Sequence, residues 1–141
     1  MSDGQLRAAT AVVASLGLLV SSYLTWVHYE PAALACTRGG GCETVQHSDY
    51  AVLLGVPVAL LGAVTWAAVL VLVLRDGPTA RALVLALALA ALAFVAYLVI
   101  LQLFVIDAIC IWCMVNDAVL VPLLAVVAFL RYRTGEEPAA G

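Results

Sequence analysis

The sequence predicts an all-α integral membrane protein, a bundle of four transmembrane helices with an outward loop and a short surface helix between the first two. Of its 141 residues, 66% are hydrophobic and only 11% are charged. A soluble domain of this size needs more polar surface to cover its core. The apolar residues also fall in long runs, each able to cross a hydrocarbon layer of about 30 Å at about 1.5 Å per residue. These observations place the chain in a bilayer.

Each apolar run is expected to be a helix, because lipid offers no hydrogen-bond partner to an open backbone. Residues 1–133 are therefore expected to form one membrane domain, and 134–141 a disordered tail. In the third run, alanines recur at three- and four-residue spacing from Ala82 to Ala96. We expect this face to pack inside the bundle, although alanine also serves as an ordinary apolar residue. The predicted spans are 8–27, 57–74, 82–106 and 109–130.

The placement of arginine predicts the orientation. Five of the six basic residues flank the chain ends or the turn between the second and third spans, and only Arg38 lies on the other side. The positive-inside rule then places both termini in the cytoplasm of a multi-pass protein of the cell (inner or plasma) membrane. The 28–56 loop and the 107–109 turn face outward. So few charges argue against nucleic acid as a partner.

The four cysteines all fall on the outward side, where disulfides persist. Cys110 and Cys113 form a C-x-x-C motif at the start of the fourth span. A helix start favours the thiolate, because its free N–H groups and dipole lower the thiol pKa. Cys36 and Cys42 lie on a loop with three consecutive glycines, which is expected to be flexible. A mobile pair beside a fixed pair suits sequential thiol–disulfide exchange.

Other interpretations of these cysteines remain open. Two structural disulfides would staple a small outward cap in a non-catalytic membrane protein. Four cysteines also suffice for a zinc site, but a bundle held by lipid needs no structural metal, so no metal is expected. Between the cysteines, Glu43 to Leu54 is expected to form a short helix at the membrane surface.

The pattern as a whole resembles the vitamin K epoxide reductase family, in particular its small bacterial members. The resemblance covers nearly the whole chain: four spans, a cysteine pair in the first outward loop, and C-x-x-C opening the fourth span. It includes Val45 and Ser48 after Cys42, and then Gly55-Val56-Pro57 at the second span. The DsbB type, another four-helix family that generates disulfides, has its C-x-x-C in the first outward loop instead.

The resemblance implies roles for single residues. Cys113 corresponds to the cysteine beside the quinone and Cys110 to its partner. Cys42 corresponds to the loop cysteine that exchanges with Cys110, and Cys36 to the one that meets a thioredoxin-like protein. Ser48 matches a hydroxyl near the active centre, although a local helix cap explains it equally well.

Two departures from the family pattern alter the expectation. Many bacterial relatives carry a fused thioredoxin-like domain, whereas this chain ends after the fourth span, so we expect a separate DsbA-like or thioredoxin-like partner outside the cytoplasm. Animal members have a tyrosine where this chain has Asp117, one turn beyond Cys113. A buried carboxyl group there is expected to relay a proton to the quinone, and Asn116 to bond a quinone carbonyl.

The sequence therefore predicts a membrane thiol–quinone oxidoreductase that generates disulfides. Electrons would pass from the partner through Cys36 and Cys42 to Cys110 and Cys113, then to a quinone of the menaquinone, ubiquinone or vitamin K type. The alternative within enzymology is that reduction of the quinone, or of vitamin K epoxide, is the main purpose.

Overall fold

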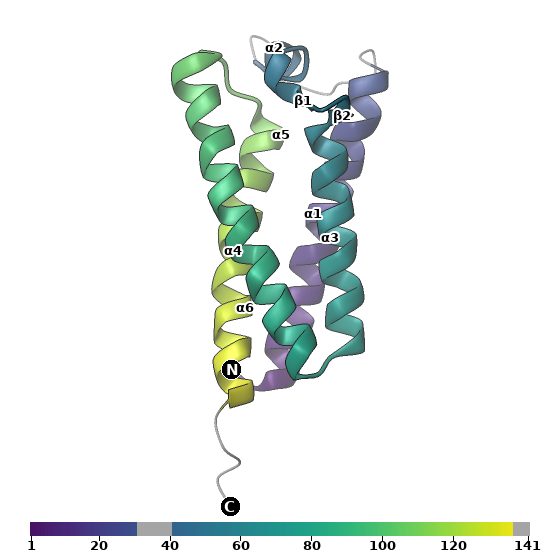
Figure 1. Ribbon diagram of the computed structural model, residues 1–141, viewed down its shortest axis with the longest axis vertical. Coiled ribbons are helices and arrows are strands. Elements are labelled where there is room, and N and C mark those ends of the chain that lie inside the picture. Colours follow the sequence, from purple (N-terminus) through teal and green to yellow (C-terminus); the bar gives the residue numbers. More distant parts are fainter. Residues whose placement is uncertain (31–40, 137–141) are drawn as a thin grey trace, which may run out of the picture.

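The computed structural model describes residues 1–30 and 41–136 and shows an elongated bundle of helices (Figure 1). Within these ranges, four helical segments are long and apolar enough to cross a membrane, as the sequence predicted. Two of them include a π-helical stretch next to the C-x-x-C motif, η3 in the third span and η4 in the fourth. The spanning segments are α1 (Asp3–Tyr29), α3 (Val58–Arg75), α4 with η3 (Pro78–Ile100, Leu101–Val105), and α5, η4 and α6 (Ile111–Met114, Val115–Leu120, Val121–Glu136).

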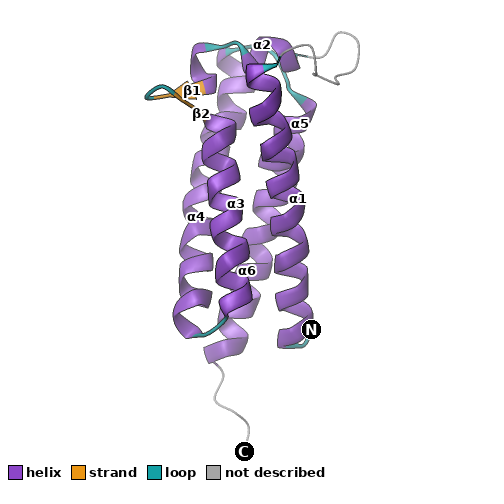
Figure 2. Cartoon of the chain, turned by 90° about the vertical axis from the view of Figure 1, so that its right-hand side faces the viewer, coloured by secondary structure: helices purple, strands orange, loops and turns teal. Residues whose placement is uncertain are grey.

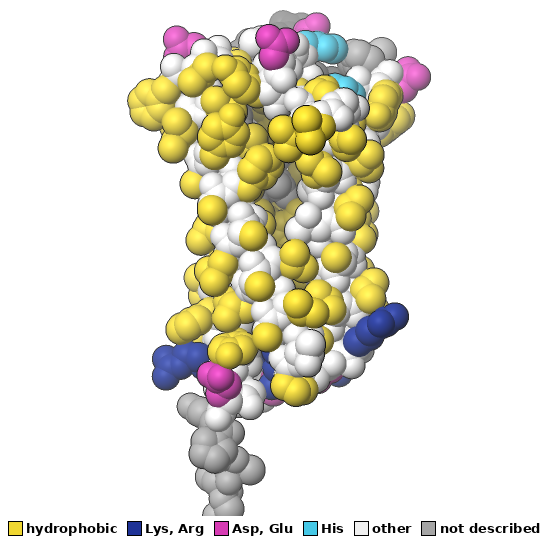
Figure 3. Space-filling view, viewed as in Figure 1, with side chains coloured by type: hydrophobic (Ala, Val, Ile, Leu, Met, Phe, Trp, Pro, Cys, Tyr) yellow, Lys and Arg dark blue, Asp and Glu magenta, His cyan; other side chains and the backbone are white. Residues whose placement is uncertain are grey.

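The two ends of the bundle differ in chemistry. The N-terminus, the turn between α3 and α4 and the end of α6 lie at one end (Figure 1). Cys42, Cys110 and Cys113 lie at the other, where α2 (Cys42–Gln46) and the start of α5 meet. One face of the molecule shows a wide apolar surface between these ends, with arginines at the lower end (Figure 3). A membrane would cover this apolar band.

The surface helix expected between Glu43 and Leu54 is only partly present. α2 ends at Gln46, and a short 3₁₀ turn, η2 (Asp49–Ala51), follows it. The chain then forms a small antiparallel hairpin of β1 (Val52–Leu53) and β2 (Val56–Pro57), which projects from the bundle (Figure 2). Leu54 and Gly55 at its tip both have positive φ, 52° and 83°, the geometry of a tight hairpin turn. Glycine at the second turn position and valines on both strands favour this hairpin over a helix.

The prediction for the alanine face was wrong. The five alanines of that stripe are all exposed, and α4 instead packs through Val84, Ala88 and Val95. The buried face of α4 therefore lies at other positions of the helix than this stripe, while alanine costs little on a surface that lipid covers. The exposed alanines are Ala82, Ala86, Ala90, Ala93 and Ala96.

Charged residues join the helices at the end opposite the cysteines. Arg131 of α6 is 2% exposed, and its Nη2 lies 2.6 Å from Oδ1 of Asp76, in the turn after α3. Arg81 of α4 contacts both Asp76 and Asp3, the first residue of α1. α6 also extends to Glu136, so 134–136 are helical rather than part of a disordered tail. The remaining residues of that tail lie outside the described part of the chain.

Candidate functional site

The C-x-x-C motif lies where the chain enters the fourth span. Cys110 has an extended backbone and is the N-cap of α5, so the helix begins directly after it. Its sulfur accepts a hydrogen bond from the backbone N–H of Cys113 at 3.4 Å. Both residues carry free thiols. The helix start therefore directs a backbone donor at the first sulfur, as the sequence predicted.

The loop cysteine Cys42 lies against this motif. It is held in a disulfide, is completely buried, and packs in one cluster with Cys110 and Leu24 of α1. Its neighbour Gly41 donates a backbone hydrogen bond to the carbonyl of Ile109 at 3.1 Å. Cys36 lies outside the described residues, so the role expected for it stays a prediction.

Gln46 links the loop to the second cysteine of the motif, a contact that the sequence reasoning missed. It lies at the end of α2, four residues after Cys42, so both share one face of that short helix. Its side-chain Nε2 donates to the sulfur of Cys113 at 3.5 Å. The i, i+4 spacing from Cys42 was the signal available in the sequence.

The surroundings of Cys110 favour its thiolate. A hydrogen bond from the side chain of Cys113 lowers the pKa of Cys110 to about 7, although burial opposes this effect. Backbone N–H groups of Cys113 and Trp112 and the side chain of Gln46 act in the same direction. A lowered pKa increases the thiolate fraction of Cys110, and the thiolate is the form of cysteine that attacks a disulfide.

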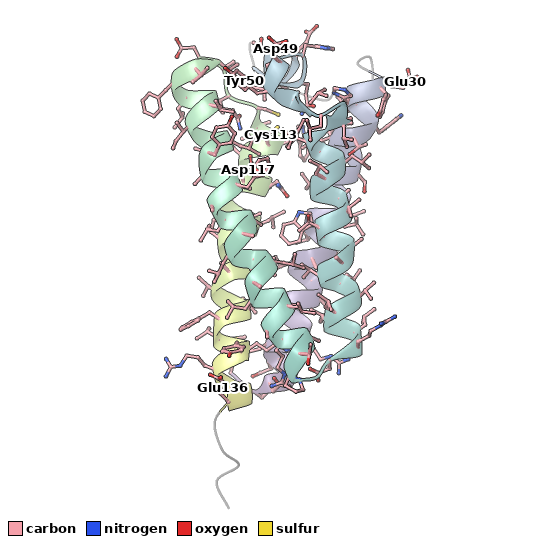
Figure 4. The ribbon with its side chains drawn as sticks, viewed as in Figure 1. Glu30, Asp49, Tyr50, Cys113, Asp117 and Glu136 are labelled. Atoms are coloured by element: carbon pink, nitrogen blue, oxygen red, sulfur yellow. The ribbon has the colours of Figure 1, made fainter. Side chains whose placement is uncertain are left out.

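A cavity of about 300 Å³ lies below α2 and η2, between α3 and α4. Cys113 and Asp117 reach its wall from the fourth span (Figure 4), and a recess is visible on this face of the molecule (Figure 3). Its wall is predominantly apolar, and the lining residues Leu61 of α3 and Phe94 of α4 are exposed at the side of the bundle. A flat, apolar molecule dissolved in the bilayer could therefore reach Cys113 from the side.

Asp117 and Asn116 take part in a chain of polar contacts along the cavity wall. The indole Nε1 of Trp66 donates to Oδ1 of Asn116 at 2.9 Å. Nδ2 of Asn116 in turn donates to Oδ1 of Asp117, also at 2.9 Å. Asp117 is 5% exposed, and both residues line the cavity. Asn116 thus orients the carboxyl group, and its expected contact with a quinone stays a prediction.

Ser48 also lines the cavity. Its hydroxyl donates to the carbonyl of Val45 at 2.8 Å, which closes the end of α2. The local cap that the sequence allowed is therefore present, and the hydroxyl oxygen retains its capacity to accept.

Gln102 is a second residue that the sequence reasoning missed. It is a buried amide in η3, and its Oε1 accepts the backbone N–H of Cys110 at 3.0 Å. A single amide in an otherwise apolar third span was the available signal, because a polar group inside a membrane helix needs a partner.

Comparison with known families agrees with this geometry. The model of the vitamin K epoxide reductase family matches residues 8–128, which include all four cysteines and all four spanning segments in large part. The chain belongs to the vitamin K epoxide reductase family. Membership makes it a membrane oxidoreductase of the quinone-linked thiol type, and the four spanning helices agree with that assignment.

Members of the vitamin K epoxide reductase family use a quinone as electron acceptor or substrate and generally work with thioredoxin-like proteins. Among residues 1–30 and 41–136, no group of three or more potential metal ligands comes together.

Proposed function

We propose that this protein oxidises the thiols of a separate thioredoxin-like partner and passes the electrons to a quinone. The partner's dithiol reduces the loop disulfide of Cys36 and Cys42 and becomes a disulfide itself. The two loop thiols then reduce a disulfide between Cys110 and Cys113. Finally, the thiols of Cys110 and Cys113 give two electrons and two protons to the quinone, which becomes a quinol, and their disulfide forms again.

The observation that supports this sequence of steps is the different placement of the two motif cysteines. Cys110 is buried against Cys42, so its sulfur faces the loop. Cys113 lines the apolar cavity instead. This difference supports a relay in which one cysteine exchanges with the loop and the other reacts with a lipid-soluble acceptor, because a purely structural disulfide does not require it.

Asp117 is the proposed proton source or relay at the quinone, with Asn116 and Ser48 as further residues of the quinone site. Asn116, itself held by Trp66, donates to one oxygen of the carboxyl group, Oδ1, and no donor in the described ranges 1–30 and 41–136 bonds the other oxygen. A protonated carboxyl group can donate to a quinone carbonyl, whose negative charge increases as electrons arrive. A respiratory quinone such as menaquinone or ubiquinone is the proposed acceptor.

The proposed orientation places the cysteines outside the cytoplasm. Five arginines lie at the end that carries the N-terminus, the α3–α4 turn and the end of α6. The positive-inside rule assigns this end to the cytoplasm. The partner would then be a periplasmic or other extracytoplasmic protein, in a compartment where disulfides persist.

Replacing each cysteine in turn in the purified protein tests the proposal. Cys110→Ala and Cys113→Ala should abolish quinone reduction by any thiol. Cys36→Ala should block reduction by a thioredoxin-like protein but leave reduction by a small dithiol, because the small reductant reaches the motif without the loop. If Cys36→Ala and Cys113→Ala lose small-dithiol activity equally, the relay is wrong.

A membrane-impermeant thiol reagent tests the orientation. After mild reduction of intact cells, it should label Cys36 and Cys42 without disruption of the membrane. Labelling that requires a broken membrane would reverse the proposed orientation and remove the extracytoplasmic partner.

A further inference from the structure

Gln102 organises the connection that leads into the redox motif. Its side chain is 3% exposed and lines the cavity. Its side-chain oxygen accepts the backbone N–H of Cys110 at 3.0 Å, and its main-chain carbonyl accepts the N–H of Ala108 at 3.1 Å. It lies in the π-helix η3, a type of distortion that occurs frequently at functional sites. One residue thus holds both ends of the turn before the motif.

The partner of Gln102 determines which way round its amide lies. The backbone N–H of Cys110 can only donate, so the atom that faces it must be the amide oxygen. The amide nitrogen, Nε2, therefore points away from Cys110. It makes no hydrogen bond with a residue in the described ranges 1–30 and 41–136. This N–H group is not fully enclosed by protein atoms, and Gln102 lines the cavity, so this side of the amide is suited to an acceptor from a ligand.

Several other donors on the cavity wall already have acceptors. The side chains of Gln46, Trp66 and Ser48 each donate to a protein atom. Two further lining residues, the buried Ser21 of α1 and the exposed Tyr50 of η2, have a hydroxyl without an acceptor in the described part of the chain. Gln102 differs from both because it is bonded directly to the redox motif.

We propose that the side-chain N–H of Gln102 donates a hydrogen bond to a carbonyl oxygen of the quinone while the oxygen of the same amide holds Cys110. A quinone ring presents acceptors at its carbonyls and no donor, which matches a free amide N–H. The bond strengthens as the carbonyl oxygen gains charge during reduction. The inference rests on the proposed function and adds a residue that binds the acceptor and positions the motif through one planar group.

Quinone binding without turnover tests the inference. The full-length protein is oxidised so that it holds no reducing thiol, and binding of menadione, a short naphthoquinone, is followed by quenching of tryptophan fluorescence. Gln102→Glu keeps an oxygen for the N–H of Cys110 but loses the donor, so its affinity should fall about tenfold or more. Gln102→Leu has neither the oxygen nor the donor, so it should lose the bond to the N–H of Cys110 as well as the affinity for the quinone.

Gln5→Leu is the control, because Gln5 lies at the far end of α1 and takes part only in its N-terminal capping box. Equal affinity of wild type and Gln102→Glu would overturn the inference, and the near-isosteric change makes misfolding a poor explanation. Weak binding by Gln102→Leu alone would assign Gln102 a positioning role without the quinone contact, which also overturns it. If the wild type binds no quinone, the proposed function itself fails.

Discussion

The backbone N–H of Gly41 donates to the carbonyl of Ile109 at 3.1 Å, which joins the loop of the first cysteine pair to the segment before the second. A Cβ atom at position 41 would lie 2.7 Å from both the Cβ of Ala108 and the backbone N of Ile109. Only glycine permits this close approach. The contact places Cys42, the next residue, in the buried cluster with Cys110.

We expect Gly41→Ala to slow the relay at the exchange between loop and motif. The added methyl group must push the loop away from Ile109, so Cys42 and Cys110 separate. Quinone reduction driven by a thioredoxin-like protein should fall at least about tenfold, because exchange needs precise sulfur placement. Reduction driven by a small dithiol should be largely retained.

The matched control is Gly4→Ala in the first turn of α1, where the nearest atom to an added Cβ is 4.0 Å away. This variant should behave as wild type with both reductants. Equal loss of protein-driven and dithiol-driven activity in Gly41→Ala would show that the contact supports folding rather than exchange.

We expect substitutions of Asp117 to rank wild type above Asn and Asn above Ala in the rate of quinone reduction. Asp117→Asn still accepts the bond from Asn116 and retains a donor, but it cannot release a proton. Asp117→Ala keeps neither the acceptor nor the donor. Loss of one donor to a developing charge costs about 3 kcal/mol, or roughly a hundredfold in rate. Single-turnover quinone reduction measures this step.

Asp107→Asn is the control for these carboxyl changes, because Asp107 is exposed in the turn before the motif with φ 57°, which asparagine also adopts. Exchange between Cys42 and Cys110 should be unaffected in all these variants. If the Asp117→Ala protein folds and reduces quinone at the wild-type rate, the proposed proton relay is wrong and Asp117 has only a packing role.

We expect oxidation of the motif thiols to slow as the pH falls through about 7. The pKa of Cys110 is lowered to about 7, chiefly by its hydrogen bond with the side chain of Cys113, so the thiolate predominates above that pH. An ordinary cysteine would ionise at about 8.5. Thiolate absorbance of a variant that lacks Cys36 and Cys42 measures the midpoint directly.

Gln46→Leu should move this midpoint upward, because its hydrogen bond contributes to the lowered pKa. Thr44→Ala, an exposed change on the same short helix, should leave it in place. A midpoint near 8.5 in the wild type would contradict the assigned surroundings of Cys110.

We expect Asp76→Asn to destabilise the bundle at the arginine-rich end. The buried Arg131 would lose its closest carboxylate and, among the described residues, keep only the more distant Asp3, at 3.8 Å. The Tm in detergent should fall, while the matched change Asp49→Asn, exposed at the other end, should have little effect. An unchanged Tm for Asp76→Asn would exclude a structural role for the pair.

The same aspartate predicts acid sensitivity. A hydrogen bond from the backbone N–H of Gly77, aided by Arg81 and Arg131, holds the pKa of Asp76 below its usual value. A carboxyl group of this kind stabilises the fold above its unfolded pKa of about 3.9, and the contribution is lost as the pH falls through the lower folded value. Asp76→Asn should flatten this part of the stability curve.

The helical architecture follows from local properties of the sequence. The length of the apolar runs and the absence of hydrogen-bond partners in lipid suffice to predict four helices, and the C-x-x-C motif lies at the start of the fourth span as expected. The structure of the loop between Cys42 and Pro57 was harder to predict. Its amphipathic pattern favoured a helix, but the tight turn at Leu54 and Gly55 forms a hairpin instead. These features all depend on neighbours in the chain.

The site depends on contacts between distant segments, which only the tertiary structure decides. The hydrogen bond from Gln46 to Cys113 joins residues 67 positions apart in the sequence, and the one from Trp66 to Asn116 joins residues 50 positions apart. The packing of α3 and α4 against the fourth span determines whether a cavity exists beside Cys113. Residue type and spacing therefore predict which groups carry the redox chemistry, whereas helix packing decides which polar side chains surround them, because hydrogen bonds between separate helices leave no periodic signal in the sequence.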